Sequence, residues 1–218
     1  MTRLLSMVTA LCAAVVFSAC AAPNYTFVTN SSDHVYFKVP AGWNQINQRD
    51  IDKFAAGDLD EAAAAQLRAQ TWTVAFDAGE NPSIQHIFAA QVQDPVVFAR
   101  VLRRDGGDGS AMTLDALRDF FLPVSETARL TAQATGQALP GFRSVVDDVT
   151  TREGGLKGVH EVFHYTVNGV VQTFDQTALA TKDGSRVYIL LVRCTRSCYA
   201  ERHDEVASVV RSFIVSEH

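Results

Sequence analysis

Four β-rich segments follow one another along the second half of the chain, and tight turns separate them. The segments cover residues 142–151, 158–167, 170–180 and 186–192, and the turns are Gly154-Gly155, Asn168-Gly169 and Asp183-Gly184. An Asn-Gly pair between two β-rich runs is a strong short-range signal for a hairpin, because both residues tolerate positive φ. The sequence therefore predicts an antiparallel meander, which limits the chain to folds built around such a sheet.

The remaining segments predict a mixture of strands and helices around this meander. Strands are predicted at 35–39, 71–76, 87–91 and 96–102, and helices at 48–70 with a break at Gly57, after Thr113, at 125–135 and at 201–213. The last helix is amphipathic, since Val206, Val209, Val210 and Phe213 recur at helical spacing. This order predicts an α+β domain in which helices cover an antiparallel sheet.

The N-terminus has the pattern of an export signal that ends at a cysteine. Arg3 gives a short basic region, and an apolar stretch of 14 residues, 4–17, follows it. That stretch is too short for a bilayer, which needs about 20 residues. Phe17-Ser18-Ala19-Cys20 resembles a bacterial lipobox, in which the cysteine carries acyl chains such as palmitate and becomes the new N-terminus. An ordinary signal cut after Ala22, without an anchor, is the alternative.

The lipobox divides the chain into three expected parts. Residues 1–19 are the signal peptide, residues 20–32 the lipidated N-terminus with a flexible spacer, and residues 33–218 a single domain. Removing residues 1–19 takes away Arg3 and no acidic residue, so 18 basic and 24 acidic residues leave a formal charge of −6. An acidic surface disfavours nucleic acid as a partner. Acyl chains at Cys20 would hold the protein at the extracytoplasmic face of the cell membrane.

The cysteine count agrees with export. Of the four cysteines, Cys12 is discarded with the signal and Cys20 carries lipid, which leaves Cys194 and Cys198. An even pair in an oxidising compartment predicts a disulfide. A zinc site needs about four ligands, and these two cysteines supply only half of them.

Three pieces of the sequence resemble one known family. The start, Tyr36-Phe37-Lys38-Val39-Pro40-Ala41-Gly42-Trp43, is similar to the opening of PsbP/Mog1-like domains, the meander is the second piece, and the helix that ends in Ser212-Phe213 is the third. With the lipobox, the chain resembles LpqN-type lipoproteins of actinobacteria. The resemblance implies a curved antiparallel sheet between helices (an α/β/α sandwich), used as an adaptor and in some members to hold a small hydrophobic ligand. It implies no active site.

One motif points to a different function. His160-Glu161-Val162-Phe163-His164 matches the H-E-x-x-H pattern of zinc hydrolases, which needs a helix to bring both histidines to one metal ion. Gly158 before it and the Asn168-Gly169 turn after it favour a strand. In a strand the two histidines lie roughly 13 Å apart at about 3.3 Å per residue, too far to share zinc.

Two other clusters give weaker signals. Asp105-Gly106-Gly107-Asp108-Gly109 lacks the acidic spacing of a calcium loop, and a flexible connection is the simpler interpretation. Asp147 and Asp148 are neighbours on one predicted strand, so their side chains point to opposite faces and are poorly placed for joint acid–base catalysis.

The sequence therefore predicts a non-enzymatic, membrane-anchored accessory protein of the cell envelope. No catalytic residues, metal or cofactor are expected, and the partners are the membrane, through the lipid anchor, and envelope membrane proteins or a hydrophobic small molecule. A docking protein without a small ligand is a second reading. An exported zinc hydrolase that uses His160, Glu161 and His164 is the alternative from another class.

Overall fold

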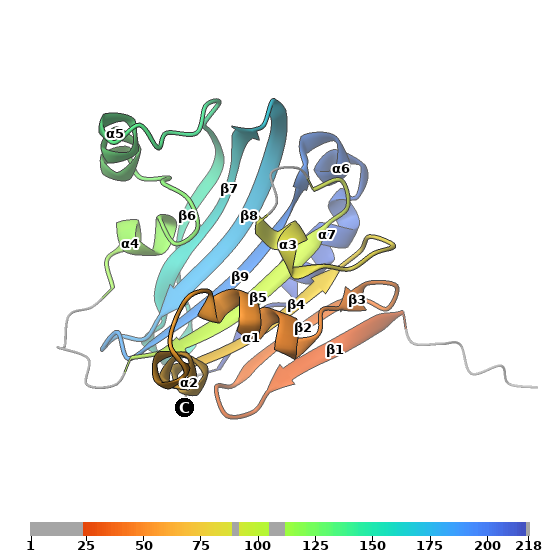
Figure 1. The fold of residues 1–218 in the computed structure, drawn as a ribbon, viewed down its shortest axis with the longest axis vertical. Helices are drawn as coiled ribbons and strands as arrows, with labels where there is room; N and C mark the ends of the chain where they lie inside the picture. The colour runs from red at the N-terminus through yellow and green to blue at the C-terminus, as the bar shows by residue number, and fades with distance from the viewer. Residues whose placement is uncertain (1–23, 89–91, 105–111, 217–218) are drawn as a thin grey trace, which may run out of the picture.

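The computed structural model describes residues 24–88, 92–104 and 112–216, which fold around a large antiparallel sheet (Figure 1). Within these residues the sheet has seven strands in the order β3-β4-β5-β9-β8-β7-β6, and each neighbouring pair is antiparallel. Its strands are β3 (Asn44–Gln45), β4 (Thr71–Asp77), β5 (Val96–Arg103), β6 (Arg143–Thr151), β7 (Lys157–Val167), β8 (Val170–Ala180) and β9 (Arg186–Thr195). The predicted α+β fold, a curved antiparallel sheet flanked by helices, is confirmed.

The predicted meander is the half of this sheet from β6 to β9. Asn168 and Gly169 join β7 to β8 with φ values of 49° and 80°, the double positive φ of a tight hairpin turn. Gly158 lies where β7 approaches β8 closely, because an added Cβ would be 1.9 Å from the backbone oxygen of Ala178. Only glycine, which has no Cβ, lets β7 pair with β8 at this distance.

A second, smaller sheet corrects the predicted spacer. β1 (Tyr25–Asn30) pairs antiparallel with β2 (Val35–Pro40), and β10 (Ile214–Val215) pairs with the other edge of β2. The flexible spacer predicted for residues 20–32 is therefore wrong for residues 25–30, which are part of the folded domain. The polar residues that flank β1, Asn24 before it and Asn30-Ser31-Ser32 at its end, hid the β-forming run 25–29.

Helices connect the strands. They are α1 (Gln48–Ala56), α2 (Glu61–Gln70), α3 (Ile84–Phe88), α4 (Leu114–Arg118), α5 (Glu126–Ala134), α6 (Arg196–Glu201) and α7 (His203–Arg211), with a short 3₁₀ turn at Glu153–Gly155. Two predictions are wrong in detail. The strand predicted at 87–91 is helical where the structure describes it, because α3 continues to Phe88. The single helix predicted at 201–213 is instead divided at Arg202, and a second helix precedes it.

Apolar cores lie on both faces of the large sheet. On one face, β1, β2 and α7 cover the central strands, with Phe37, Phe213 and Leu190 among the buried side chains. On the other face, α1, α3 and α4 cover the sheet, and Leu191 and Phe98 lie beneath them. Neighbouring residues of β9, Leu190 and Leu191, thus belong to opposite cores, as the alternation of side chains along a strand requires.

Candidate functional site

A small apolar pocket opens on the sheet face that carries α3 and α4. Its volume is ≈ 160 Å³, and it is lined by Ile87, Phe121, Leu122, Leu139, Val167, Phe174, Leu191 and Arg193. We call it the sheet pocket. Strand residues form one side, and α3 and the segments on either side of α5 form the other. Its space corresponds to about five water-sized groups at ~30 Å³ each, and an apolar lining with one cationic group is typical of a site for a hydrophobic ligand.

Arg193 is the polar group in this lining. Its side chain is buried, and its guanidinium lies 4.9 Å from the centre of the Phe174 ring. Nη1 donates to the backbone oxygen of Ile87 at 2.9 Å, and Nη2 lies 3.5 Å from Oε1 of Gln172. Burial lowers the pKa of Arg193 to about 10, so the group remains charged at neutral pH. A buried cation at the wall of an apolar pocket can attract an oxygen atom of a bound ligand.

Two further hollows adjoin the sheet pocket. One has a volume of ≈ 310 Å³ and shares Leu139 with it, and the other has a volume of ≈ 430 Å³ and shares Phe121 and Leu122. Both hollows include residues of α5, and Ala132 lines both of them. The three hollows therefore surround α5 and the segment that leads into it, and they offer more room than the sheet pocket alone.

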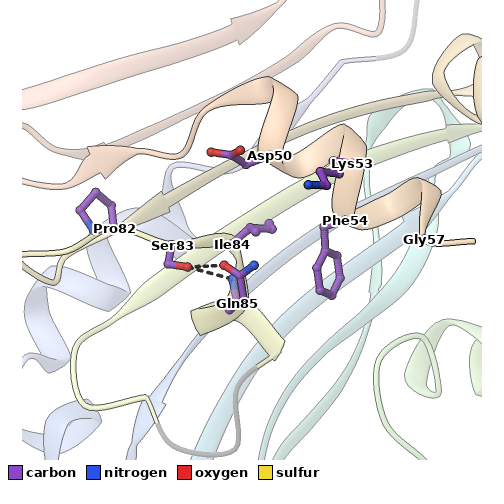
Figure 2. A pocket seen from close by; sticks show the side chains of 8 residues that line it. All are labelled: Asp50, Lys53, Phe54, Gly57, Pro82, Ser83, Ile84 and Gln85. Atoms are coloured by element: carbon purple, nitrogen blue, oxygen red, sulfur yellow. Dashed lines mark hydrogen bonds between the residues drawn. The ribbon is translucent and has the colours of Figure 1, made fainter.

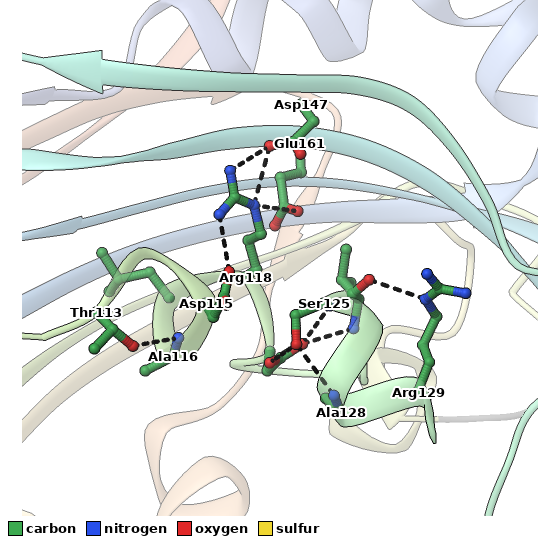
Figure 3. Close-up of polar contacts among 12 residues, drawn as sticks. Thr113, Asp115, Ala116, Arg118, Ser125, Ala128, Arg129, Asp147 and Glu161 are labelled. Carbon is green, nitrogen blue, oxygen red and sulfur yellow. Dashed lines mark hydrogen bonds and ion pairs between the residues drawn. The ribbon is translucent and has the colours of Figure 1, made fainter. Parts of the chain in front are cut away.

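Helix α5 is held mainly by polar contacts at its first turn. None of its residues is buried, and Leu130 is 57% exposed. Ser125 caps the helix, since its hydroxyl accepts a hydrogen bond from the backbone of Ala128 (Figure 3). Asp119 accepts hydrogen bonds from the backbone of Val124 and from both the backbone and the hydroxyl of Ser125. Figure 1 shows α5 at the periphery of the molecule. An element with so little buried apolar surface opens locally at low free energy, which makes it an adjustable wall for a binding site.

The H-E-x-x-H segment lies entirely within β7, as the flanking glycines predict. His160 and His164 point to the face opposite Glu161. Nε2 of His160 lies 2.9 Å from Oδ1 of Asp175, and Nδ1 of His164 lies 3.1 Å from the hydroxyl of Thr173. The described residues contain no group of three His, Cys, Asp or Glu side chains placed to hold a metal ion.

Glu161 belongs to a separate ionic cluster on the pocket side of the sheet. Arg118 of α4 donates to Asp147 of β6 at 2.8 Å and to Asp115 at 3.1 Å, and its Nε lies 3.8 Å from the Glu161 carboxylate (Figure 3). Burial, and then the nearby charge of Asp147, raise the pKa of Glu161 to about 7. None of the hollows described above includes Glu161 in its lining. The cluster therefore fixes α4 on the sheet and contributes nothing to the sheet pocket.

Asp147 and Asp148 keep the opposed orientation that the strand predicts. Asp147 pairs with Arg118, whereas Asp148 lies opposite His160 on the other face. The two carboxylates do not share a site.

A network on the other face joins β7, β8 and α6. The carboxylate of Asp175 is buried; Oδ1 faces His160, and Oδ2 accepts a hydrogen bond from the Tyr199 hydroxyl at 2.6 Å. The hydrogen bond to Asp175 raises the pKa of His160, and burial raises that of Tyr199. The side chains of Tyr199, Asp175 and His160 thus contact one another, but none of them lines any of the hollows in this section.

Cys194 and Cys198 form a disulfide in the structure, with their Cα atoms 6.0 Å apart. Cys194 lies near the end of β9 and Cys198 lies in α6, so the bond fixes the start of that helix against the sheet. Cys20 and the Asp105–Gly109 cluster lie outside the described residues.

A hollow of ≈ 570 Å³, larger than the three above, lies between α1 and α3 (Figure 2). Figure 2 shows Phe54 pointing from α1 into the space beside α3. The other lining residues are mixed in character: Asp50, Lys53, Gly57, Pro82, Ser83, Ile84 and Gln85. It lacks a cluster of groups that would define one ligand, so the sheet pocket remains the better candidate.

Sequence reasoning did not identify the residues of these sites. Arg193 and Asp175 lie in segments that alternate like any buried strand, and Tyr199 lies in a helix that was not predicted. A charged residue within an apolar run, such as Arg193 after Leu190-Leu191-Val192, is the one signal that could have marked the pocket. No helix in the described residues has the length and apolarity needed to cross a membrane.

Comparison with solved structures identifies the fold. A PsbP protein from the cyanobacterium Synechocystis sp. PCC 6803 superposes with a TM-score of 0.54 at 12% identity, covering 91% of this chain and 96% of its own. LpqN of Mycobacterium tuberculosis, described as involved in cell envelope biogenesis, superposes with a TM-score of 0.45 at 14% identity, covering 88% of this chain and 91% of its own. The Ran-binding protein Mog1p of Saccharomyces cerevisiae superposes with a TM-score of 0.43 at 9% identity, covering 89% of this chain and 96% of its own.

No protein-family model and no curated protein sequence matches the chain. The structural likeness therefore shows the fold alone, which is that of the cyanobacterial PsbP protein and agrees with the sequence resemblance.

Proposed function

We propose that this protein is a non-enzymatic, membrane-anchored lipoprotein of the bacterial cell envelope that holds a hydrophobic ligand in the sheet pocket. Lipid at Cys20 would confine the domain to the membrane surface. Confinement raises the effective concentration of the domain near envelope lipids and membrane proteins.

The sheet pocket is the observation that carries this proposal. Seven of its eight lining residues are apolar, and Arg193 supplies the one charged group. The neighbouring hollows extend the space around α5, so a ligand longer than the pocket can continue along the helix. A binding protein needs such an apolar pocket with few polar groups, whereas a hydrolase also needs a nucleophile or metal beside it.

The zinc hydrolase alternative finds no support in the arrangement of its three residues. His160 and His164 lie on an extended strand and each faces a different neighbour, Asp175 and Thr173 respectively. Glu161 lies on the opposite face, so it could not act as a general base for a metal held by the histidines.

A fluorescent fatty acid, 11-(dansylamino)undecanoic acid, tests the ligand pocket with the full-length protein in mild detergent. We expect saturable fluorescence enhancement, and Leu139→Trp should reduce the affinity about tenfold or more, because the larger ring takes up space in the sheet pocket and in the hollow that shares Leu139 with it. Leu130→Trp is the matched control, since Leu130 is exposed on α5 and lines none of the three hollows. Equal binding by both variants would contradict the proposal.

The anchor has its own test. Replacement of Cys20 by Ala should release the protein from the membrane fraction, because no acyl chain can then be attached. Cys12→Ala should leave it membrane-bound, since the proposal discards Cys12 with the signal. Fractionation followed by intact-mass measurement distinguishes the outcomes, and an unlipidated wild-type mass would refute the anchor.

A further inference from the structure

Strand β6 leaves a long edge of the large sheet unpaired. Among the described residues it pairs only with β7, and most of its nine residues are exposed. Val145 and Val149 are 53% and 59% exposed, which is unusual for β-branched residues in a strand. At the opposite end of the sheet, β3 has only two residues. The open edge at β6 is therefore the place where this sheet can accept another strand.

The hydrogen-bond pattern identifies which backbone groups face outward. The backbone N–H of Arg152 donates to the oxygen of Leu156, and hydrogen-bonded pairs alternate along an antiparallel ladder. Counting back from Arg152, Asp148 and Thr150 direct their backbone groups to β7. Asp147, Val149 and Thr151 direct theirs away from the sheet, and no contact within the described part of the chain satisfies them.

The side chains along this edge define the chemistry of its partner. Asp147 lies on the pocket side, where it pairs with Arg118, and Asp148 lies on the other side, so the centre of the edge carries one carboxylate on each face. Val149 lies beside buried Val159 at the border of an apolar cluster, and Val146 is half-buried on the opposite face. A complementary strand carries two adjacent basic residues opposite the aspartates and an apolar β-branched residue on either side of them.

We infer that β6 is a docking edge for an extended segment of another polypeptide, which adds an eighth strand through the outward groups of Asp147, Val149 and Thr151. Main-chain hydrogen bonds would supply affinity, and the acidic pair would select a basic segment. This inference goes beyond the proposed ligand pocket and does not depend on it, because the edge and the pocket share no residue.

Charge argues against a second copy as the occupant. Self-pairing would bring two Asp147 and two Asp148 carboxylates into one seam, on a chain whose formal charge is already −5. Asp147 and Asp148 protect the edge against strands of like charge, but other features that block an added strand are few. The edge contains no proline or lysine, and its bulge, between Ser144 and Val146, leaves the stretch from Val146 to Thr151 regular.

The test uses a fluorescein-labelled peptide, Thr-Thr-Val-Lys-Lys-Val-Thr, whose residues fall opposite 151 to 145 in antiparallel order. Full-length protein in mild detergent should bind it saturably, as measured by fluorescence anisotropy. The charge-reversed peptide with two glutamates should not bind. The lysine peptide N-methylated at its third and fifth residues should also fail, because those amides face the outward carbonyls of Val149 and Asp147.

Two variants of one residue separate docking from stability. Val149→Pro removes an outward N–H that makes no bond to β7, so the fold should survive while peptide affinity falls about tenfold or more. Val149→Thr keeps the N–H and should bind within about threefold of the wild type. Hydrogen exchange on the wild type adds a readout free of mutation: the amides of Asp147, Val149 and Thr151 should slow when peptide is present.

Three results would overturn the inference. The first is no saturable binding of the lysine peptide up to about 1 mM. The second is equal binding of the N-methylated or charge-reversed peptide, which would indicate a site elsewhere. The third is a dimer in sedimentation velocity that Val149→Pro converts to monomer, which would make a second copy the occupant of β6.

Discussion

The two ends of the meander differ in how much of each strand the protein covers. β9 lies inside the sheet between β5 and β8, and nine of its ten residues are buried, with α7, β1 and β2 over one face and α3 and α4 over the other. β6 lies at the edge, and seven of its nine residues are exposed. Both strands were predicted from the sequence, but β9 is mostly apolar, whereas β6 carries two aspartates, an arginine and three hydroxyl residues around its three valines. Because buried apolar residues contribute most to folding, we expect the centre of the sheet to supply most of the stability. The part of the molecule around β6 and α5 instead has exposed surface that is available for binding.

The sharpest test of this comparison is a pair of leucine truncations. Leu190→Ala in β9 should lower the free energy of unfolding by about 3 kcal/mol, because it leaves a cavity in a fully packed core. Leu130→Ala in exposed α5 should change it by less than about 0.5 kcal/mol. Urea unfolding of the two variants measures both values. Similar losses would mean that α5 is as firmly packed as the sheet centre.

The next effect concerns the attachment of the small sheet to the central strands. Asp33, between β1 and β2, is fully buried, accepts a hydrogen bond from Asn30 at 2.7 Å, and forms an ion pair with Arg103 at the end of β5. Asp33→Ala should lower the free energy of unfolding by about 2 kcal/mol. This is less than the loss expected for a fully buried ion pair, because Arg103 is partly exposed. Thermal unfolding measures the loss, with Asp58→Ala in an exposed turn as control. An unchanged midpoint would show that apolar packing alone holds the hairpin.

The buried carboxylate beside β6 should make stability depend on pH. The pKa of Glu161 is raised to about 7, so between the unfolded value near 4.5 and about 7 the folded state binds more protons than the unfolded state. Stability should therefore fall as pH rises through this window. Glu161→Gln should flatten that decline and gain about 1–2 kcal/mol over the wild type at pH 8, since each pKa unit is worth about 1.4 kcal/mol and Arg118 offsets part of the shift.

Unfolding curves at pH 5 and pH 8 measure this difference. Glu201→Gln, which replaces an exposed carboxylate, should leave the pH dependence as it is in the wild type. A wild type that gains stability between pH 5 and pH 8 while Glu161→Gln does not would contradict the assigned direction.

The smallest expected effect concerns Asp175 of β8, which contacts both Tyr199 of α6 and His160 of β7. Tyr199→Phe removes the hydrogen bond from α6 to Asp175 and should cost about 1 kcal/mol. Asp175→Asn should lower the pKa of His160, because the carboxylate is the main cause of its upward shift. Titration of the histidine resonances by NMR measures that pKa. An unchanged value would place His160 outside the network.

Local features of the sequence determined the meander, its hairpin and most helix starts. Asn168 and Gly169 define the turn by their tolerance of positive φ, and Thr113 and the glycine at 136 mark helix ends through contacts a few residues away. These features depend on neighbours in sequence, so the chain alone contains the information. The cysteine pair is equally local, and the predicted bond between Cys194 and Cys198 agrees with the structure.

Only the tertiary structure decided which segments meet. The pairing of β5 with β9 joins residues about ninety positions apart, and β10 completes a sheet that begins with β1, close to the other end of the chain. The sheet pocket depends on such contacts, since Arg193 of β9 contacts Phe174 of β8 and Ile87 of α3. The polar residues of β6 and the apolar run of β9 indicate their different burial, but the sequence does not show which segments cover β9. Alternation along a strand shows that two faces exist, but burial depends on which distant segments pack there, and no local pattern encodes that choice.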